Sequence, residues 1–218
     1  MKLVVFGANG RTGRHVVRQA IDRGHTVTAA IRRPDEFPFT APGLRVVRAD
    51  ALDGETVTDA VTGHDAVISA LGGTYTRKPV SVFSRGMGNI TNAMTAQGIR
   101  RLVCVSSVCV AGKAAPGETA IFRLLLLPIL LELGRTAYRD MHRMEDIARN
   151  SGLDWTIVRA SGLVDGTRIT DYTVAPSSIA GRYTSRADLA DALLREATEN
   201  RNVDACIDVV TTAGRAMR

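Results

Sequence analysis

The chain has 218 residues, of which 45% are hydrophobic and 23% are charged, a composition typical of a globular domain. This excludes wholesale disorder, collagen and coiled coil, and the length suits one domain with a full core. Lysine and arginine number 28 against 22 acidic residues, so the formal net charge is +6. Because the 25 arginines are scattered along the chain, we expect no nucleic-acid partner.

The cysteines and the first residues bear on the compartment. Cys104, Cys109 and Cys206 are an odd number without a Cys-x-x-Cys pair, which argues against a disulfide scaffold and against a zinc site. The sequence opens directly into the strand-like run Lys2–Phe6, without the basic and apolar segments of a secretory signal. We therefore expect a cytoplasmic protein with no metal site.

Short apolar runs alternate with longer segments of helical periodicity. The expected strands, in chain order, are Lys2–Phe6, His25–Ile31, Leu44–Arg48, Ala66–Ala70, Leu102–Ser106 and Trp155–Val158. The expected helices are Arg14–Arg23 (ended by Gly24), Val80–Gln97, Tyr138–Asn150 and a last helix that begins after Ser185, with Asp188 near its positive end.

This alternation predicts an α/β fold. We expect a Rossmann-like, doubly wound parallel sheet in a three-layer arrangement. Residues 1–218 should form a single domain with a small C-terminal substrate-side region. The substrate-side elements are expected mainly within 111–137 and 160–184.

Ile121–Leu133 is the one long apolar stretch, with 13 residues that include Arg123, Pro128 and Glu132. A membrane-spanning helix needs about 20 apolar residues, so we expect no membrane span. The stretch could be helical cover over the sheet, which we favour, a pocket wall, or a subunit contact. Pro128 should break or kink a helix here. We expect a monomer or a homodimer.

A glycine-rich segment directly follows the first expected strand and precedes the first helix. It reads Gly-x-x-Gly-x-x-Gly and comprises Gly7, Ala8, Asn9, Gly10, Arg11, Thr12 and Gly13. Gly7 permits a tight turn, Gly10 lets the backbone approach a pyrophosphate, and Gly13 lets the helix pack close to the sheet. The helix N-terminus supplies unpaired N–H groups for the phosphates. The segment therefore predicts a dinucleotide site.

The end of the second expected strand indicates which dinucleotide binds. An NAD site usually places an acidic residue here, whereas this strand ends in Arg32 and Arg33. Arginines suit the 2′-phosphate of NADPH through charge-assisted hydrogen bonds. Asp35 and Glu36 follow only after Pro34, which should turn the chain away. We therefore favour NADPH as the cofactor.

Several motifs resemble one family. The glycine segment is similar to that of the extended and atypical short-chain dehydrogenases/reductases, and the segment 101–107, RLVCVSS, resembles their strand that ends in an active-site serine. The segment 151–159, SGLDWTIVR, resembles a motif of the NAD(P)-binding, NmrA-like atypical group, as does 185–190, SRADLA. The length and the Asp140-x-x-Arg143-Met144 stretch are most similar to the biliverdin reductase B/flavin reductase type.

The resemblance extends the expected cofactor site to other strand ends. In related families the position of Asp50 and Ala51 flanks the adenine, with the carboxylate reaching its amino group; Asp50 could also cap the following helix. Leu71, Gly72 and Gly73 follow the fourth expected strand, where small residues let the backbone pass close to the ribose and pyrophosphate.

The resemblance also implies catalytic residues. The family uses a serine with Tyr-x-x-x-Lys; Ser107 fits the serine, with Ser106 as the alternative and as a possible cofactor contact, and Tyr138 fits the tyrosine. The lysine is missing, and His142 occupies its place by spacing. His142 could donate a proton near neutral pH, or it could be structural.

The missing lysine constrains the reaction. Alcohol dehydrogenation needs a positioned strong base, whereas reduction of a quinone, a flavin or a conjugated aromatic carbonyl can take its proton from water. We therefore expect an NADPH-dependent reductase acting on a small aromatic molecule. The alternatives are an NmrA-like NADP(H)-sensing regulator without turnover, and an NAD(P)-dependent epimerase or isomerase.

Overall fold

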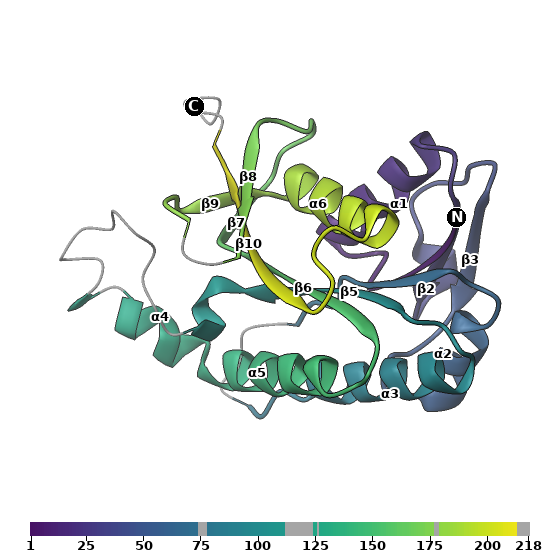
Figure 1. Cartoon of the computed structure of the whole chain (residues 1–218), viewed down its shortest axis with the longest axis horizontal. Helices are drawn as coiled ribbons and strands as arrows, with labels where there is room; N and C mark the ends of the chain where they lie inside the picture. Colours follow the sequence, from purple (N-terminus) through teal and green to yellow (C-terminus); the bar gives the residue numbers. More distant parts are fainter. Residues whose placement is uncertain (74–77, 112–123, 126, 177–178, 213–218) are drawn as a thin grey trace.

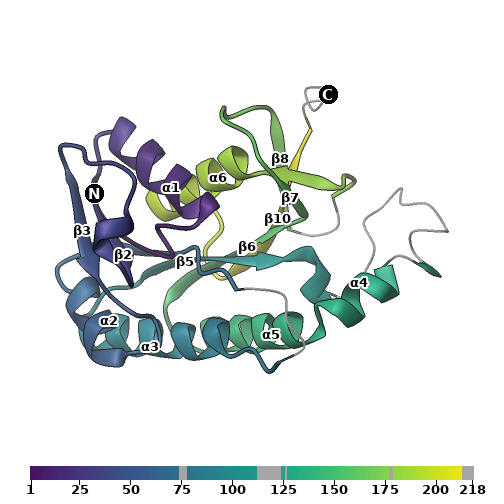
Figure 2. The same cartoon turned by 180° about the vertical axis from the view of Figure 1, so that it is seen from behind.

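An eight-stranded sheet lies between two layers of helices in the computed structural model, which describes residues 1–73, 78–111, 124–125, 127–176 and 179–212 (Figures 1 and 2). Its strands are β1 (Lys2–Phe6), β2 (Thr26–Ile31), β3 (Leu44–Arg48), β4 (Ala66–Ser69), β5 (Arg101–Ser107), β6 (Asp154–Ala160), β8 (Tyr172–Ala175) and β10 (Ala205–Thr211). The strand order is β3-β2-β1-β4-β5-β6-β10-β8. Every neighbouring pair is parallel except β8 with β10. This confirms the expected Rossmann-like, doubly wound single domain.

Helices cover both faces of the sheet. On one face lie α1 (Arg11–Asp22) and α6 (Arg186–Glu199), and on the other α2 (Gly54–Val61), α3 (Val82–Ala96) and α5 (Arg135–Arg149) (Figure 1). The β1 side chains alternate between the two layers: Leu3 and Val5 join the core with α1 and α6, and Val4 and Phe6 join the other. The other elements are α4 (Leu127–Leu133), the 3-10 turns η1 (Pro34–Glu36) and η2 (Val108–Ala111), and a separate parallel pair, β7 (Gly162–Val164) with β9 (Tyr183–Ser185).

The helix ends follow local chemistry. Gly24, at φ 78°, follows the last turn of α1, as the sequence predicted. The Ser185 hydroxyl accepts a 3.2 Å hydrogen bond from the amide of Ala187, so the predicted cap of α6 is confirmed. The possibility that Asp50 caps the next helix is wrong, because Asp53 occupies that position and accepts from the amide of Glu55 at 3.1 Å.

The N-terminus of α3 is capped from another helix. Asp140 of α5 is fully buried, and its carboxylate accepts hydrogen bonds from the amides of Phe83 at 2.9 Å and Ser84 at 3.3 Å. The Ser84 hydroxyl donates to the same carboxylate at 2.5 Å. A negative charge at this end of the helix is favourable. Asp140 therefore ties the start of α3 to α5.

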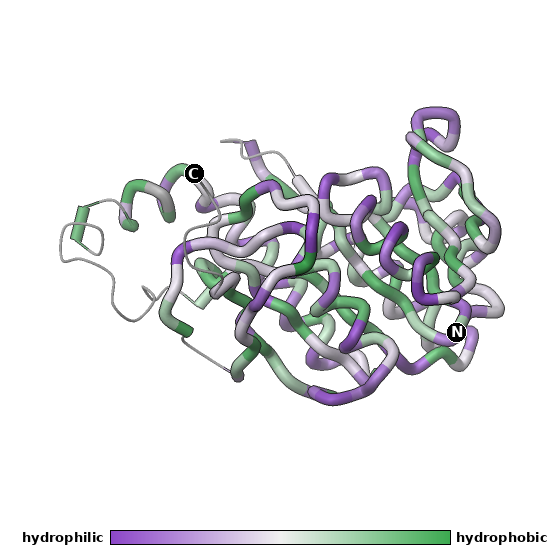
Figure 3. Tube along the Cα trace, turned by 90° about the horizontal axis from the view of Figure 1, so that it is seen from above, coloured by the Kyte–Doolittle hydropathy of each residue, from purple (hydrophilic) through white to green (hydrophobic). Residues whose placement is uncertain are grey.

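Helix α4 stands apart from the sheet, and the views in Figures 1 and 2 agree on this. Figure 3 shows it as a largely hydrophobic segment at one end of the molecule. Ile129 is 49% exposed and Leu133 56% exposed, so the favoured expectation of helical cover over the sheet is wrong. Pro128 is the second residue of α4, in the first turn where a missing N–H is tolerated, so it does not kink the helix. Residues 121–123 and 126 of the predicted stretch lie outside the described residues.

No helix in the described part of the chain is both long and apolar enough to cross a bilayer.

Candidate cofactor and active site

A cleft of about 800 Å³ opens beyond the carboxyl ends of the parallel strands. It lies where the chain order reverses between β1 and β4, which is where ligands bind in open α/β sheets. All the predicted cofactor residues line it except Gly13, Arg33 and Ser106, so the lining contains Gly7, Asn9, Gly10, Arg11, Thr12, Arg32, Asp50, Ala51, Leu71, Gly72 and Gly73. Residues from four strand ends thus converge on one site.

The glycine segment is tightly folded. Gly7 has φ 73°, and a Cβ added there would lie 2.4 Å from the carbonyl oxygen of Ala70. A Cβ added to Gly13 would lie 2.2 Å from the carbonyl oxygen of Gly7, so Gly13 sets how closely α1 approaches the loop. Helix α1 begins at Arg11, and its first turn contains no acidic residue. Its first amides and its positive end are therefore available to phosphate groups.

The end of β2 presents a cation to the cleft. Arg32 lines the cleft, whereas Asp35 and Glu36 belong to η1 and are absent from the cleft lining. Arg33 Nη1 pairs with Glu36 Oε1 at 2.9 Å on the exposed surface, outside the cleft. No carboxylate therefore lies at the β2 position that usually binds a ribose 2′-hydroxyl.

The opposite wall is built by close packing of α3. A Cβ on Gly86 of α3 would lie 2.9 Å from Leu71 Cδ1 and 3.2 Å from Ala51 Cβ. At Gly72 an added Cβ would meet nothing within 4 Å, so this backbone faces open space in the cleft. Asp50 Oδ1 accepts from the amide of Leu52 at 3.0 Å. A narrow slot with exposed backbone and an adjacent carboxylate fits a dinucleotide.

Arg186, which the sequence did not single out as a ligand, completes the rim. It is the first residue of α6 and lines the cleft. Its Nη1 is 2.8 Å from Asp165 Oδ1, and Arg11 Nη1 is 2.7 Å from the other oxygen of that carboxylate. Hydrogen bonding from Arg11 holds the pKa of Asp165 below its ordinary value. Asp165 therefore links the glycine segment to the start of α6.

Ser106 does not line the cleft. Its hydroxyl is buried and donates to Glu145 Oε1 at 2.7 Å. The same carboxylate receives Arg159 Nε at 2.9 Å and Nη2 at 2.6 Å. Arg149 Nη2 contacts Glu145 Oε2 at 2.5 Å and Cys206 Sγ at 3.2 Å. Ser106 thus belongs to a buried ion-pair network between α5, β5, β6 and β10.

Glu145 is a buried carboxyl group surrounded by basic partners. Burial would raise its pKa, but hydrogen bonds from Arg159 and Ser106 and the positive charge of Arg159 together hold that pKa below its ordinary value. The sequence analysis missed this residue, because a glutamate in an amphipathic helix is typical of a solvated face. The only available signal was the arginine at the end of SGLDWTIVR.

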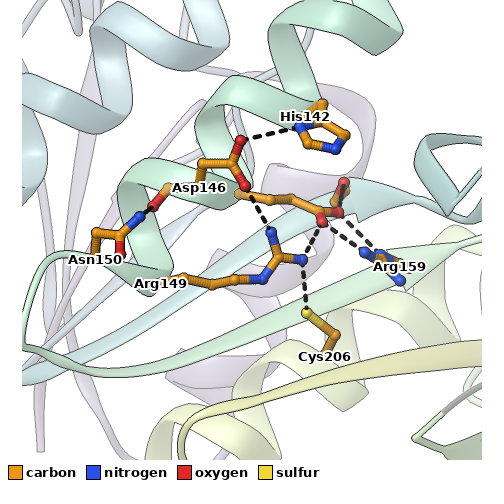
Figure 4. Close-up of polar contacts among 8 residues, drawn as sticks. His142, Asp146, Arg149, Asn150, Arg159 and Cys206 are labelled. Carbon is orange, nitrogen blue, oxygen red and sulfur yellow. Dashed lines mark hydrogen bonds and ion pairs between the residues drawn. The ribbon is translucent and has the colours of Figure 1, made fainter.

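None of the three predicted catalytic residues lines the cleft. Ser107 ends β5, and its hydroxyl accepts from the amide of Cys109 at 3.2 Å. Tyr138 and His142 both line a second hollow of about 430 Å³ beside the first turns of α5. The Tyr138 ring lies against Gly134, where an added Cβ would be 2.4 Å from it. His142 Nδ1 is 3.0 Å from Asp146 Oδ2, and its side chain is 61% exposed (Figure 4).

The chain belongs to a family of NAD(P)H-binding proteins, whose pattern matches residues 7–200. A curated relative, an uncharacterised chloroplastic protein of Arabidopsis thaliana, is 31% identical over 216 residues, which is 93% of this chain and 75% of that protein. The matched region runs from Gly7 through α6 and contains every residue that lines the cleft except Phe6. The prediction that the glycine segment forms a dinucleotide site therefore agrees with the family.

Two solved structures are similar over nearly the whole chain. A short-chain dehydrogenase/reductase of Veillonella parvula in complex with NADP has a TM-score of 0.79 at 18% identity, covering 97% of this chain and 95% of that one. An anaerobilin reductase of Escherichia coli O157:H7 has a TM-score of 0.77 at 21% identity, covering 98% of each chain. At these identities the likeness shows the fold.

Proposed function

We propose that the protein is an NADPH-dependent reductase that acts in the cytoplasm, as a monomer or homodimer, on a small aromatic acceptor of the quinone, flavin or conjugated-carbonyl class. The choice of NADPH over NADH rests on one observation: Arg32 lines the cleft, whereas Asp35 and Glu36 lie in η1, outside the cleft lining. A guanidinium there would pair with a 2′-phosphate. The Veillonella neighbour, which was solved with NADP, supports the same class of cofactor.

The residues of the cleft fit the cofactor in three parts. The first-turn amides of α1, Arg11 and Arg186 would hold the pyrophosphate, Arg32 the 2′-phosphate, and Asp50 the adenine edge. When it is bound there, the cofactor supplies a hydride. The protein's part is to orient the ring at the end of β5 and to exclude water.

The edge of the site supports an acceptor that needs little acid catalysis. Tyr138 has no lysine four residues on, and Ser107 lines neither the cofactor cleft nor the second hollow. A conjugated acceptor takes the hydride readily, and its proton can come from water, Tyr138 or His142. One structural neighbour is, by its name, an anaerobilin reductase, which supports a reductase for this chain.

The decisive experiment mixes the purified protein, NADPH and a panel of quinones and flavins, and follows the absorbance of the reduced nicotinamide. Turnover that requires both protein and acceptor supports the reductase. Tight NADPH binding without oxidation by any acceptor would overturn it in favour of the sensing regulator, which the position of Ser107, Tyr138 and His142 outside the cofactor cleft also fits. Stoichiometric oxidised cofactor in the purified protein would instead indicate an epimerase.

A further inference from the structure

The second hollow combines an apolar wall with a stripe of arginines. Val110 of η2 and Leu131 of α4 supply the apolar side, and the Tyr138 ring faces the same space. Arg135, Arg139 and Arg143 lie along one side of α5, because residues four apart share a helix face. Such a hollow suits a ligand with an aromatic body and an anionic end.

The hollow lies at the same edge of the sheet as the cofactor cleft. Helix α5 runs antiparallel to the parallel strands that it connects, so its first turns lie near their carboxyl ends. Val105 of β5 lines the cofactor cleft, and Val110, five positions later, lines the hollow. A molecule held in the hollow therefore lies on the side from which an acceptor would approach the cofactor.

Among the described residues, the arginines of the hollow have more positive charge than nearby carboxylates neutralise. Arg135 Nε is 3.4 Å from the exposed carboxylate of Glu132. Arg143 Nη2 is 3.2 Å from Asp140, a carboxylate already committed to the N-terminus of α3. Arg139 is exposed and makes no hydrogen bond or ion pair within the described residues. An unpaired guanidinium beside two weakly neutralised ones is a site for a carboxylate or a phosphate.

We propose that this hollow binds the anionic substituent of the acceptor, with Arg139 as its principal ligand and Arg135 as its second. The inference rests on the proposed reductase function and adds a specificity to it: acceptors that carry a carboxylate or phosphate are preferred over neutral acceptors with the same ring. Arg139 is thus a specificity-determining residue, and it does not act on the hydride.

The test compares riboflavin with flavin mononucleotide, which share one ring system and differ in the phosphate. We expect a lower KM for flavin mononucleotide. Arg139→Ala should raise that KM about tenfold, the equivalent of one charge-assisted hydrogen bond, and should leave kcat and the KM for riboflavin unchanged. Arg139→Lys should recover part of the preference. Arg45→Ala, which removes an exposed arginine from edge strand β3, serves as the matched control.

Direct titration of flavin mononucleotide, followed by quenching of flavin fluorescence, separates the two proposals. If both flavins have the same KM, and Arg139→Ala changes neither value, the anion site is overturned while the reductase function stands. Binding of flavin mononucleotide that depends on Arg139, with no oxidation of NADPH by any acceptor, would support the anion site and overturn the reductase. Loss of binding in Arg45→Ala as well would overturn the site, because the effect would then follow net charge alone.

Discussion

The guanidinium of Arg159 donates two hydrogen bonds to the carboxylate of Glu145, one to each oxygen, at 2.9 and 2.6 Å. Glu145 lies on α5 and Arg159 near the end of β6, so the pair fixes that helix to the sheet close to the predicted active-site edge. Arg149 and Ser106 occupy the remaining positions around the same carboxylate. Its acceptor capacity is therefore used by partners that come from three elements.

Glu145→Gln should lower the free energy of unfolding by about 3 kcal/mol, because it leaves the guanidinium of Arg159 without its countercharge, whereas Arg149 keeps Asp146. Asp146→Asn, one residue further and 51% exposed, should cost less than about 1 kcal/mol. Urea unfolding at neutral pH measures both. Equal, small losses in the two variants would contradict a buried ion pair.

The same carboxylate predicts an acid-sensitive stability. The folded pKa of Glu145 is lowered, so the folded state binds fewer protons than the unfolded state below the unfolded value of about 4.3. Its contribution is complete above that pH and is lost as the pH falls through the folded pKa. Unfolding free energies measured from pH 6 downward should fall less steeply in Glu145→Gln than in the wild type. If unfolding free energy falls with pH equally steeply in both proteins, groups other than Glu145 cause the acid sensitivity.

Arg32→Ala should raise the KM for NADPH about tenfold or more and leave the KM for NADH nearly unchanged, because only NADPH carries the 2′-phosphate. Arg33→Ala is the matched control, since Arg33 is paired with Glu36 and lies outside the cleft. Steady-state kinetics with both cofactors and one acceptor measure the effect. If Arg32→Ala weakens both cofactors equally, Arg32 does not bind the 2′-phosphate.

Gly13→Ala should destabilise the protein by about 2 kcal/mol, because its Cβ would overlap the carbonyl of Gly7. Gly88→Ala, in the middle of α3, meets nothing within 4 Å and should stabilise by about 0.5 to 1 kcal/mol through helix propensity. Both replace a helical glycine, so the comparison isolates the contact. A Gly13→Ala variant as stable as the wild type would mean that the glycine segment can shift.

Asp165→Asn should tighten NADPH binding by about threefold at low salt, because it removes an anion that competes with phosphate for Arg11 and Arg186. The gain should shrink as salt is added, since the pair with Arg11 is exposed. Fluorescence titration with NADPH measures it, with the exposed Asp171→Asn as control. Weaker binding in Asp165→Asn would instead make this carboxylate part of the cofactor site.

The parallel core and the cofactor cleft follow from local patterns. The strands β1 to β6 and their order along the chain come from short apolar runs, and the glycine segment identifies the dinucleotide site. The strands β7 to β10 were not predicted. Strands β7 and β9 have three residues each and pair only with one another, β8 has four residues, and the apolar run of β10 is interrupted by Asp208. The helix α2 was missed because its eight residues are too few for a clear period.

The remaining differences depend on tertiary structure. Ser106 and Ser107 are adjacent in the sequence, but alternate residues of a strand face opposite sides, and Ser106 points into the network of Glu145. The apolar composition of α4 predicted burial, yet Ile129 and Leu133 are exposed. Asp140 was notable only as part of a resemblance, and its role as the cap of α3 depends on two helices that meet 57 residues apart.

The cleft is assembled from segments as distant as Gly7 and Arg186, and an unfolded chain therefore has no dinucleotide site at all. Cofactor binding must then favour the native state by mass action, by about 2.7 kcal/mol when its free concentration is about one hundred times Kd. The loss of stability caused by a substitution far from the cleft, such as Glu145→Gln, would consequently be offset in a cell rich in NADPH. It would become apparent when NADPH is depleted. The lifetime of such a variant would follow the supply of reduced cofactor.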